Sequence, residues 1–465
     1  MAREHGSLSS NESFSIHEPS SKQVHAMEIE QSGSSEPELR GPISKSWILK
    51  RVTLSCVSAI SAVIAIAVVI VVVLKNHEAA NSAGANLASD SDYILAGHLG
   101  AVDASMILYS ISSKTSFDGL ARQTPAIERT YYHSLDFKYY VDIVKKFLKD
   151  NRIPVSSIAC ACFVVEATVV DGHAFITIDE DRNAGESTRV YDIDAKWMTD
   201  HLKFKVVLVN DFLSFGYGVL GLGSDNTALL TLQEGEKAIG QTKVVMGLGS
   251  GGGLGIAHMN ADSEGHYTSY SSEGGLRLFT PQDDLESDLL THIRKAKFGA
   301  SHISVEAALN MSILYDFFAK RHPEKVSQVA HEEIMSMGAD AGSVISRYAV
   351  DGQEVCDMVI QKVFSIFGAT AGDVALDFLP KGGLYIGAGT LGGTFGIIKQ
   401  HFTRFLEGDD CFMCQFEKKG KRMSSIVKKI PVYLVLRPRS TTLALDLAGA
   451  LFVARRVYLK EETGD

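Results

Sequence analysis

The chain has 465 residues, of which 45% are hydrophobic and 22% are charged, the ordinary balance of a globular protein. Its formal net charge is −10 and it has no block of basic residues, which argues against nucleic acid as a partner. Six cysteines are too few for a disulfide scaffold in a chain of this length. Cys411 and Cys414 form one isolated Cys-x-x-Cys pair, which argues against a structural zinc site and leaves the redox role of the pair open.

The N-terminal region divides into a polar tail, an apolar segment and a linker. Residues 1–46 are rich in Ser, Glu, Gln and His and have few large apolar side chains, so we expect them to be disordered. Residues 52–74 contain no charge and would span roughly 34 Å as a helix, enough to cross a hydrocarbon core of about 30 Å. A buried core helix would carry a polar stripe, and a cleaved signal segment is usually shorter. We therefore expect a single transmembrane helix in contact with membrane lipid, followed by a linker over residues 75–91.

Charges beside this segment predict how the helix would be oriented. Lys45, Lys50 and Arg51 precede it, and only Lys75 follows closely. The positive-inside rule favours a cytoplasmic N-terminus, with the globular region on the luminal side of the membrane. Asn310-Met311-Ser312 is a glycosylation sequon that would be available on that side. We expect a single-pass membrane protein, with a luminal globular region favoured.

From residue 92 onward, short apolar runs alternate with longer amphipathic stretches, which is typical of an α/β fold. About 390 residues follow the apolar segment, and at the usual domain size this length predicts two domains. We expect a small α/β domain over residues 92–212, joined by a C-terminal helix at about 440–456, and a large α/β domain over 213–439. Strands are expected at residues 93–96, 105–111, 157–164, 205–209, 243–246, 384–386 and 430–436, and a helix at 139–148.

An amide and a carboxylate follow the apolar run at residues 205–209. Asn210 and Asp211 stand at the carboxyl end of this expected strand, where open α/β sheets bind their ligands. A carboxylate there can take the proton of a substrate hydroxyl, and the amide can donate to and accept from other hydroxyls. The alternative is that the pair makes a turn or caps the next helix.

A glycine-rich segment, Gly247 to Gly255, follows the expected strand at residues 243–246. Backbone N–H groups of such a segment can approach phosphate oxygens closely. Gly247, Gly249 and Gly252 satisfy the spacing of a dinucleotide fingerprint, but residues 256–259 predict a strand where that fingerprint needs a helix. The Gly-Lys-Ser/Thr of a P-loop is also absent. A flexible glycine linker remains the alternative.

Two glutamates complete the set of candidate site residues. Glu273 lies in Ser272-Glu273-Gly274-Gly275, and Glu306 lies in Ser304-Val305-Glu306-Ala307. A pair of carboxylates can bind a polyol by accepting from adjacent hydroxyls. Taken separately, each glutamate is more often a solvated surface residue.

Taken in order, these segments resemble the bacterial-type glucokinase family, the sugar kinases of the actin and hexokinase fold. The resemblance runs from about Tyr93 to the C-terminus. It implies a two-domain actin-like ATPase fold (hexokinase/ribonuclease H-like) and phosphorylation of glucose or a related hexose at the 6-hydroxyl, the first step of glycolysis. Asp211 would be the general base, and the sugar would be bound by Asn210, Asp211, Glu273 and Glu306.

The resemblance also implies ATP and its Mg²⁺ as cofactors, and it leaves a homodimer open. No side chain of this chain is assigned as a metal ligand. The implied nucleotide contacts lie in three glycine-containing segments: Gly97, Gly100 and Asp103; Gly247, Gly249, Ser250 and Gly251; and Gly387 and Gly389.

The chain departs from the family at two positions that bear on catalysis. His98 stands where the family has an aspartate that helps to hold the Mg²⁺, and an imidazole is a poor ligand for this hard ion. Leu276 stands at the position of a sugar-binding histidine and cannot hydrogen-bond a hydroxyl. The sequence therefore predicts a glucokinase-like enzyme with a degraded metal site and impaired turnover. The alternative is a non-catalytic, membrane-anchored pseudokinase that binds a sugar or a nucleotide.

Overall fold

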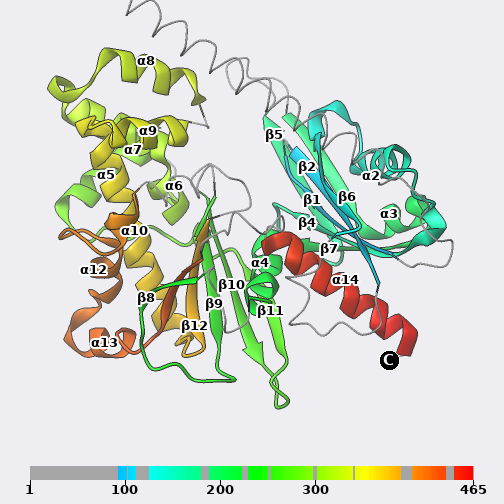
Figure 1. Cartoon of the computed structure of the whole chain (residues 1–465). Helices are drawn as coiled ribbons and strands as arrows, with labels where there is room; N and C mark the ends of the chain where they lie inside the picture. The colour runs from blue at the N-terminus through cyan, green and yellow to red at the C-terminus, as the bar shows by residue number, and fades with distance from the viewer. Residues whose placement is uncertain are drawn as a thin grey trace, which may run out of the picture. The chain divides into compact units, whose positions relative to one another are not determined.

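The computed structural model of the chain is shown in Figure 1. It describes residues 93–101, 103–111, 125–179, 188–222, 229–249, 253–296, 301–338, 341–388, 401–435 and 445–463. The expected tail, transmembrane helix and linker lie outside these residues, so the structure does not test them. Within the described part, one helix is long and apolar enough to cross a membrane, α10 at Glu354–Phe378. This helix belongs to the protein core, since 78% of its apolar window is buried.

A five-stranded sheet has the strand order β3-β2-β1-β4-β7. Its strands are β1 Tyr93–Leu99, β2 Asp103–Ser110, β3 Ile127–His133, β4 Ile158–Val165 and β7 Lys205–Asn210. β1, β4 and β7 are parallel, whereas β2 and β3 are added antiparallel. A separate two-stranded sheet pairs β5 His173–Asp179 with β6 Thr188–Asp194. The three parallel strands bring their carboxyl ends to one edge of the five-stranded sheet.

Alternating residues of the five-stranded sheet pack against different helices, as the period of two along a strand requires. Along β1, Leu95 and Leu99 join the cluster that includes helices α2 Tyr140–Asp150 and α3 Ala195–Leu202. Ile94 and Ala96 join the cluster formed by α14, Leu445–Thr463. Both faces are therefore covered, which accounts for the continuous apolar runs of β1, β4 and β7.

A six-stranded sheet has the order β11-β10-β9-β12-β13-β8. Its strands are β8 Leu229–Gln233, β9 Lys243–Leu248, β10 Leu254–Ala261, β11 Tyr267–Ser272, β12 Gly383–Ala388 and β13 Val432–Val435. β9, β12 and β13 are parallel neighbours, and the outer strands are antiparallel. The helices on this part of the chain are α5 Asp284–Ala296, α6 Val305–Leu309, α7 Met311–Arg321, α8 Gln328–Ser336, α9 Ala341–Val350, α10, α12 Phe412–Glu417 and α13 Gly420–Val427.

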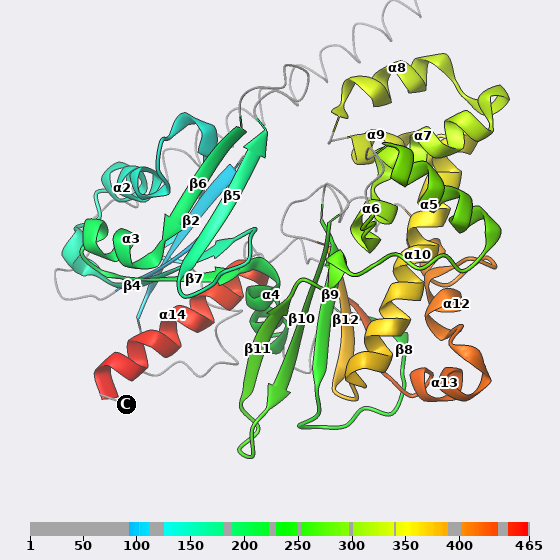
Figure 2. The ribbon, with the colours of Figure 1, turned by 180° about the vertical axis from the view of Figure 1, so that it is seen from behind.

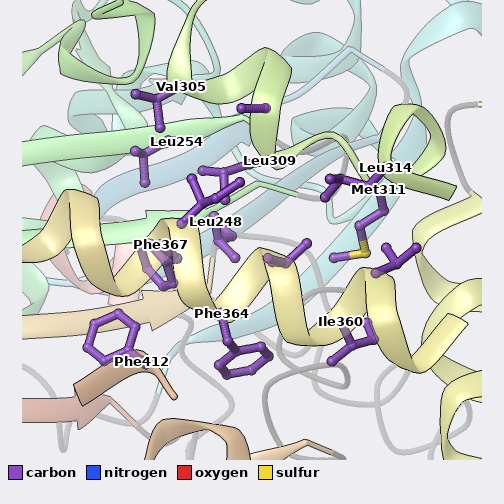
Figure 3. Close-up of a cluster of buried hydrophobic side chains, with 14 of the residues drawn as sticks. Leu248, Leu254, Val305, Leu309, Met311, Leu314, Ile360, Phe364, Phe367 and Phe412 are labelled. Carbon is purple, nitrogen blue, oxygen red and sulfur yellow. The ribbon is translucent and has the colours of Figure 1, made fainter. Parts of the chain in front are cut away.

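The core of this second part is built around α10 (Figure 3). Phe364 and Phe367 of α10 lie in one buried cluster with Leu248 of β9 and Leu254 of β10. Phe412 of α12 packs edge-on against Phe367 at 5.1 Å between ring centroids. The preceding residue, Cys411, forms a disulfide with Cys414, so the isolated Cys-x-x-Cys pair is oxidised in this structure.

Helix α4, Asp211–Leu220, connects the two sheets. It begins directly after β7 of the five-stranded sheet and packs on β9, β10 and β11 of the six-stranded sheet. It also crosses α14 closely, and Figure 2 shows the two helices side by side. A Cβ on Gly218 would lie 2.0 Å from the carbonyl oxygen of Leu445, and one on Gly449 would lie 1.8 Å from that of Ser214. Only glycine allows the backbones of α4 and α14 to approach this closely.

The expected α/β class and the positions of the expected strands are confirmed, with corrections at their ends. Gly97 lies within β1, which extends to Leu99, and β2 begins at Asp103, two residues before its predicted start. The last helix begins at Leu445 and extends to Thr463, beyond the predicted end near residue 456. In each case, apolar periodicity located the element but not its ends, which pairing and packing decide. The predicted domain boundary at residues 212 and 213 stays a prediction.

Acid should destabilise the fold through His258 of β10. The imidazole is stacked between Tyr270 and Phe378, at 5.2 and 4.8 Å between ring centroids, and its burial lowers its pKa. Below its ordinary pKa of 6.5, the unfolded chain takes up this proton more readily than the folded chain, so stability should fall as the pH drops below 6.5. Urea midpoints at pH 7.5 and pH 5 would measure the effect. The loss should be smaller in His258→Phe, and an equal loss in both proteins would contradict it.

Candidate active site

Asn210 and Asp211 form a fixed unit where β7 passes into α4. The Asn210 side-chain oxygen accepts from the backbone N–H groups of Phe212 and Leu213, at 3.0 and 3.2 Å, and so caps the helix. Its Nδ2 donates to Asp211 Oδ1 at 2.8 Å and to the Ala167 carbonyl at 3.2 Å. The capping alternative is therefore confirmed for Asn210. The same side chain also orients the Asp211 carboxylate, which lies in the first turn of α4, where the helix dipole favours negative charge.

Glu273 contacts Thr168, which lies three residues after the end of β4. Thr168 Oγ1 donates to Glu273 Oε1 at 2.5 Å, although the two residues are 105 positions apart in the chain. Thr168 follows Ala167, whose carbonyl accepts from Asn210. A short series of contacts thus links the carboxylates of Asp211 and Glu273. Thr168 belongs to this site, and the sequence offered no signal for it.

Glu306 lies against the glycine-rich segment. Its Oε1 accepts from the Leu254 N–H at 2.9 Å, and a Cβ on Gly275 would come within 2.5 Å of the same oxygen. Ser304 caps α6 by accepting from Ala307 N, which places Glu306 in the first turn of that helix. Because Gly275 closely follows Glu273, the three predicted carboxylates lie along one connected part of the fold. Their predicted roles toward a sugar remain inferences from this arrangement.

The second and third predicted nucleotide segments are neighbours in the six-stranded sheet. Gly247 of β9 pairs with Gly387 of β12, at the carboxyl ends of two parallel strands. Gly249 N donates to the Gly253 carbonyl at 2.7 Å and closes the loop between β9 and β10. Ser250, Gly251 and Gly389 lie outside the described residues. The second and third segments predicted to contact the nucleotide therefore meet at one edge of the sheet.

Gly255 and Gly387 also lack a side chain because aromatic rings of α4 pack against them. A Cβ on Gly255 would lie 1.8 Å from the Phe212 ring, and one on Gly387 would lie 2.4 Å from the Phe215 ring. Both rings come from α4, the helix that begins with Asp211. The glycines thus let α4 sit directly on β10 and β12, which positions the carboxylate at its N-terminus.

Gly255→Ala should therefore disturb both stability and the site. The new methyl group overlaps the Phe212 ring, and overpacking of this kind costs about 1–3 kcal/mol. Because Phe212 adjoins Asp211, sugar-dependent turnover should fall as well. Urea denaturation and a coupled ADP-release assay would check the two effects. The control is Ala261→Gly, at the partly exposed end of the same strand and outside the buried cluster that contains Phe212, which should leave turnover unchanged. Unchanged turnover in Gly255→Ala would contradict the effect on the site.

The first predicted nucleotide segment, Gly97, Gly100 and Asp103, includes a turn that hydrogen bonds hold in place. Gly100 N donates to the Asp103 carbonyl at 3.0 Å, and the Gly100 carbonyl accepts from Ser134 Oγ at 2.9 Å and from the Tyr140 hydroxyl at 2.7 Å. A Cβ on Gly100 would lie 2.8 Å from His98 Nε2, so the imidazole fills the space beneath the turn. Gly97 packs between Met106 and Phe163 within the sheet. Asp103 is exposed at the start of β2.

Glu166 is a site residue that sequence reasoning missed. Its Oε1 lies 3.3 Å from Nε2 of the buried His98, and its side chain is 30% exposed. Mg²⁺ prefers oxygen ligands and is commonly bound by one or two carboxylates together with nucleotide phosphates. At this edge of the sheet, the carboxylate of Glu166 is therefore a suitable ligand for Mg²⁺, whereas the imidazole of His98 is not. The expectation of a degraded metal site rested on position 98 alone.

Leu276, at the expected position of a sugar-binding histidine, has an imidazole close by. The side chain of Leu276 is 49% exposed, and His302 Nε2 lies 2.8 Å from the Leu276 carbonyl oxygen. Leu278 and Ser304 form an isolated antiparallel β-bridge, and this pairing brings His302 close to Leu276. The structure thus brings His302 next to the segment that carries Glu273.

Comparison with known proteins agrees with this geometry. A family model described as Glucokinase matches residues 95–455, which is more than half of the chain. The chain belongs to the glucokinase family. Within this family of ATP:hexose phosphotransferases, the glucokinase of Synechocystis sp. is 29% identical over 366 residues, covering 74% of this chain and 94% of the relative. A glucokinase of Helicobacter pylori is 31% identical over 250 residues, covering 53% of this chain and 67% of the relative.

Solved glucokinases share the fold. The glucokinase from an Antarctic psychrotroph has a TM-score of 0.57 at 24% identity, covering 78% of this chain and 99% of that protein. The glucokinase from Balamuthia mandrillaris, solved in complex with glucose, has a TM-score of 0.62 at 16% identity, covering 81% and 99%. The mixed α/β architecture described above is therefore the glucokinase fold.

Proposed function

We propose that this chain transfers the γ-phosphoryl group of ATP to the 6-hydroxyl of glucose or a closely related hexose. The observation that carries the proposal is the position of Asp211. Its carboxylate stands at the N-terminus of α4, oriented by Asn210, and contacts run from Asn210 through the residues after β4 to Glu273. Membership of the glucokinase family indicates the class of reaction, and the retained carboxylates can serve as the general base and as ligands of the sugar hydroxyls.

Each group has a definite part in the proposed reaction. Asp211 accepts the proton of the 6-hydroxyl as the oxygen of that hydroxyl bonds to the γ-phosphorus and the bond to the ADP oxygen breaks. Glu273 and Glu306 accept from other sugar hydroxyls and fix the ring. The Mg²⁺ of the nucleotide neutralises phosphate charge when bound, and Glu166 is the side chain that fits it. Phosphoryl transfer depends mainly on such positioning and charge neutralisation.

A coupled assay tests the proposal directly. The detergent-solubilised full-length chain, incubated with Mg-ATP and glucose, should release ADP only when the sugar is present, and the product should be a hexose 6-phosphate. ADP release without sugar dependence would contradict a hexokinase reaction. No turnover, with glucose still raising the melting temperature, would favour the alternative of a sugar-binding pseudokinase, for which the substitution at position 98 is the motivating observation.

We also propose that residues 52–74 anchor the enzyme in a membrane, with the kinase region on the luminal side. The uncharged length of the segment and the excess of Lys and Arg ahead of it support this topology. Alkaline carbonate should leave the full-length chain in the membrane pellet, and protease added to sealed vesicles should spare residues 93–463. Release by carbonate would contradict the anchor. Digestion of the kinase region would contradict only the orientation.

A further inference from the structure

His98, Glu166 and Asp211 lie at or just after the carboxyl ends of β1, β4 and β7, in phase with the residues that pack against α14. Along β1, Ile94 and Ala96 face the α14 cluster, and His98 is next in phase. Along β4, the α14-facing residues are Cys160, Cys162 and Val164, and Glu166 is next in phase. Along β7, Val207 and Val209 belong to that cluster, and Asp211 follows at the same spacing. The alternation directs His98 to this side of the sheet, and Glu166 and Asp211 come directly after the ends of β4 and β7 at the same spacing.

The register places Glu166 between the other two. β4 is the middle strand of the three, and its last residue, Val165, pairs with Leu99 of β1 and with Asn210 of β7. Glu166 comes one residue later, level with the Gly100 turn on one side and with Asp211 on the other. Neighbouring strands lie about 4.8 Å apart. The Glu166 carboxylate thus stands between the turn predicted to contact phosphate and the predicted general base.

The contact with His98 fixes the direction of the Glu166 side chain. Its Oε1 lies 3.3 Å from His98 Nε2, and His98 is only 1% exposed, so the imidazole provides a rigid support from inside the protein. A Cβ on Gly100 would lie 2.8 Å from the same Nε2 atom of His98, so the carboxylate lies near the turn that follows β1. The outer part of the side chain remains 30% exposed.

We propose that Glu166 is the carboxylate that faces the metal ion of the bound nucleotide, and that His98 is its positioning residue. The inference rests on the proposed kinase function. A buried imidazole is unsuited to hold Mg²⁺ itself, whereas a carboxylate offers the oxygen ligands that this ion prefers. Replacing a residue that orients a metal ligand typically costs about 10–100-fold in metal affinity. His98 and Glu166 thus form one functional pair contributed by adjacent strands.

Binding of Mn²⁺ to the full-length chain in the presence of ADP tests the pair without requiring turnover. Free Mn²⁺ is measured by its electron paramagnetic resonance signal, so the dissociation constant of Mn²⁺ in the ternary complex can be titrated. Glu166→Gln should weaken Mn²⁺ binding at least about tenfold. The matched control is Glu264→Gln, because Glu264 lies 3.4 Å from His266 Nδ1 in an equivalent but exposed pair. The control should bind Mn²⁺ like the unchanged chain.

Variants of His98 separate positioning from mere structural support. His98→Leu preserves an apolar fit in the buried space but cannot contact the carboxylate, so Mn²⁺ affinity should fall about tenfold. His98→Gln retains a side-chain N–H toward Glu166 and should restore most of that affinity. If the two substitutions acted only by destabilising the fold, both would lower the melting temperature, and His98→Gln would bind Mn²⁺ no more tightly than His98→Leu. Equal Mn²⁺ affinity in His98→Leu and His98→Gln would overturn the positioning role.

The two proposals fail in different ways. Unchanged Mn²⁺ affinity in Glu166→Gln would overturn the metal-facing role, whether or not the unchanged chain phosphorylates glucose. Absence of any ternary complex with Mn²⁺ and ADP in the unchanged chain would overturn it as well. Conversely, Mn²⁺ binding that depends on Glu166 in a chain without sugar-dependent turnover would support the metal-facing role while contradicting the proposed kinase reaction.

Discussion

Replacing Asp211 with asparagine should lower sugar-dependent turnover by about 10²–10⁴-fold, the usual contribution of a general base. Asparagine has nearly the same shape and can still accept from Asn210 Nδ2, but it cannot take the proton of the 6-hydroxyl. Glucose affinity should change much less than turnover, because Glu273 and Glu306 still accept from the sugar. Measuring kcat for ADP release, together with the melting shift caused by glucose, separates the two effects.

An aspartate away from the site provides the matched control for this substitution. Asp200 lies exposed on α3, and Asp200→Asn removes the same charge from the chain without touching β7 or α4. Turnover in that variant should equal that of the unchanged protein. If Asp211→Asn retains more than a tenth of the unchanged turnover, Asp211 is not the base. A collapse of the melting temperature would instead indicate damage to the start of α4.

The Asn210–Asp211 pair shows how far sequence reasoning reaches. The apolar run before it predicted a strand, which the structure confirms, whereas the binding site at the carboxyl end of that strand stays a prediction. The choice between binding and capping could not be made, because both need the same residue types. The structure shows that Asn210 caps α4 and orients Asp211 at once.

Site residues whose partners lie far away in the sequence could not be predicted. Glu166 follows an apolar run and reads as an ordinary solvated glutamate, since nothing nearby in the sequence indicates that β4 pairs with β1. Thr168 and Glu273 meet across 105 positions for the same reason. Periodicity reveals which face a residue takes within its strand, but not which strand lies beside it. The departure at position 98 was therefore visible, whereas its neighbour Glu166 was not.

The glycine segments show a different limit. Gly247 and Gly255 predicted close approach of phosphate, and Gly387 close approach of the nucleotide. The structure places phenylalanines of α4 against Gly255 and Gly387. Bare backbone is needed wherever something comes close, and the sequence cannot identify what approaches. Both uses can coexist, since the Phe212 and Phe215 rings contact Gly255 and Gly387, and the nucleotide contacts of Gly247 and Gly249 stay a prediction.

Lys362→Ala should lower the free energy of unfolding by about 3–5 kcal/mol, as expected when one partner of a buried ion pair is removed. Lys362 lies in the middle of α10 and is 6% exposed, and its Nζ lies 3.2 Å from Oε1 of Glu286, which is 5% exposed. The other oxygen of Glu286 accepts from Gln282 N at 2.9 Å. Without the lysine, a buried carboxylate loses its counter-charge. Urea midpoints would measure the loss.

The control for Lys362 is a lysine in an exposed pair. Lys320 contacts Asp316 at 2.8 Å on the surface of α7, and Lys320→Ala should cost no more than about 1 kcal/mol. The double variant Lys362→Met/Glu286→Leu removes both charges and should recover most of the stability lost in Lys362→Ala. If the double variant is no more stable than Lys362→Ala, the lost ion pair is not the cause. Because α10 leads directly into β12 and Gly387, recovered stability should also restore nucleotide binding.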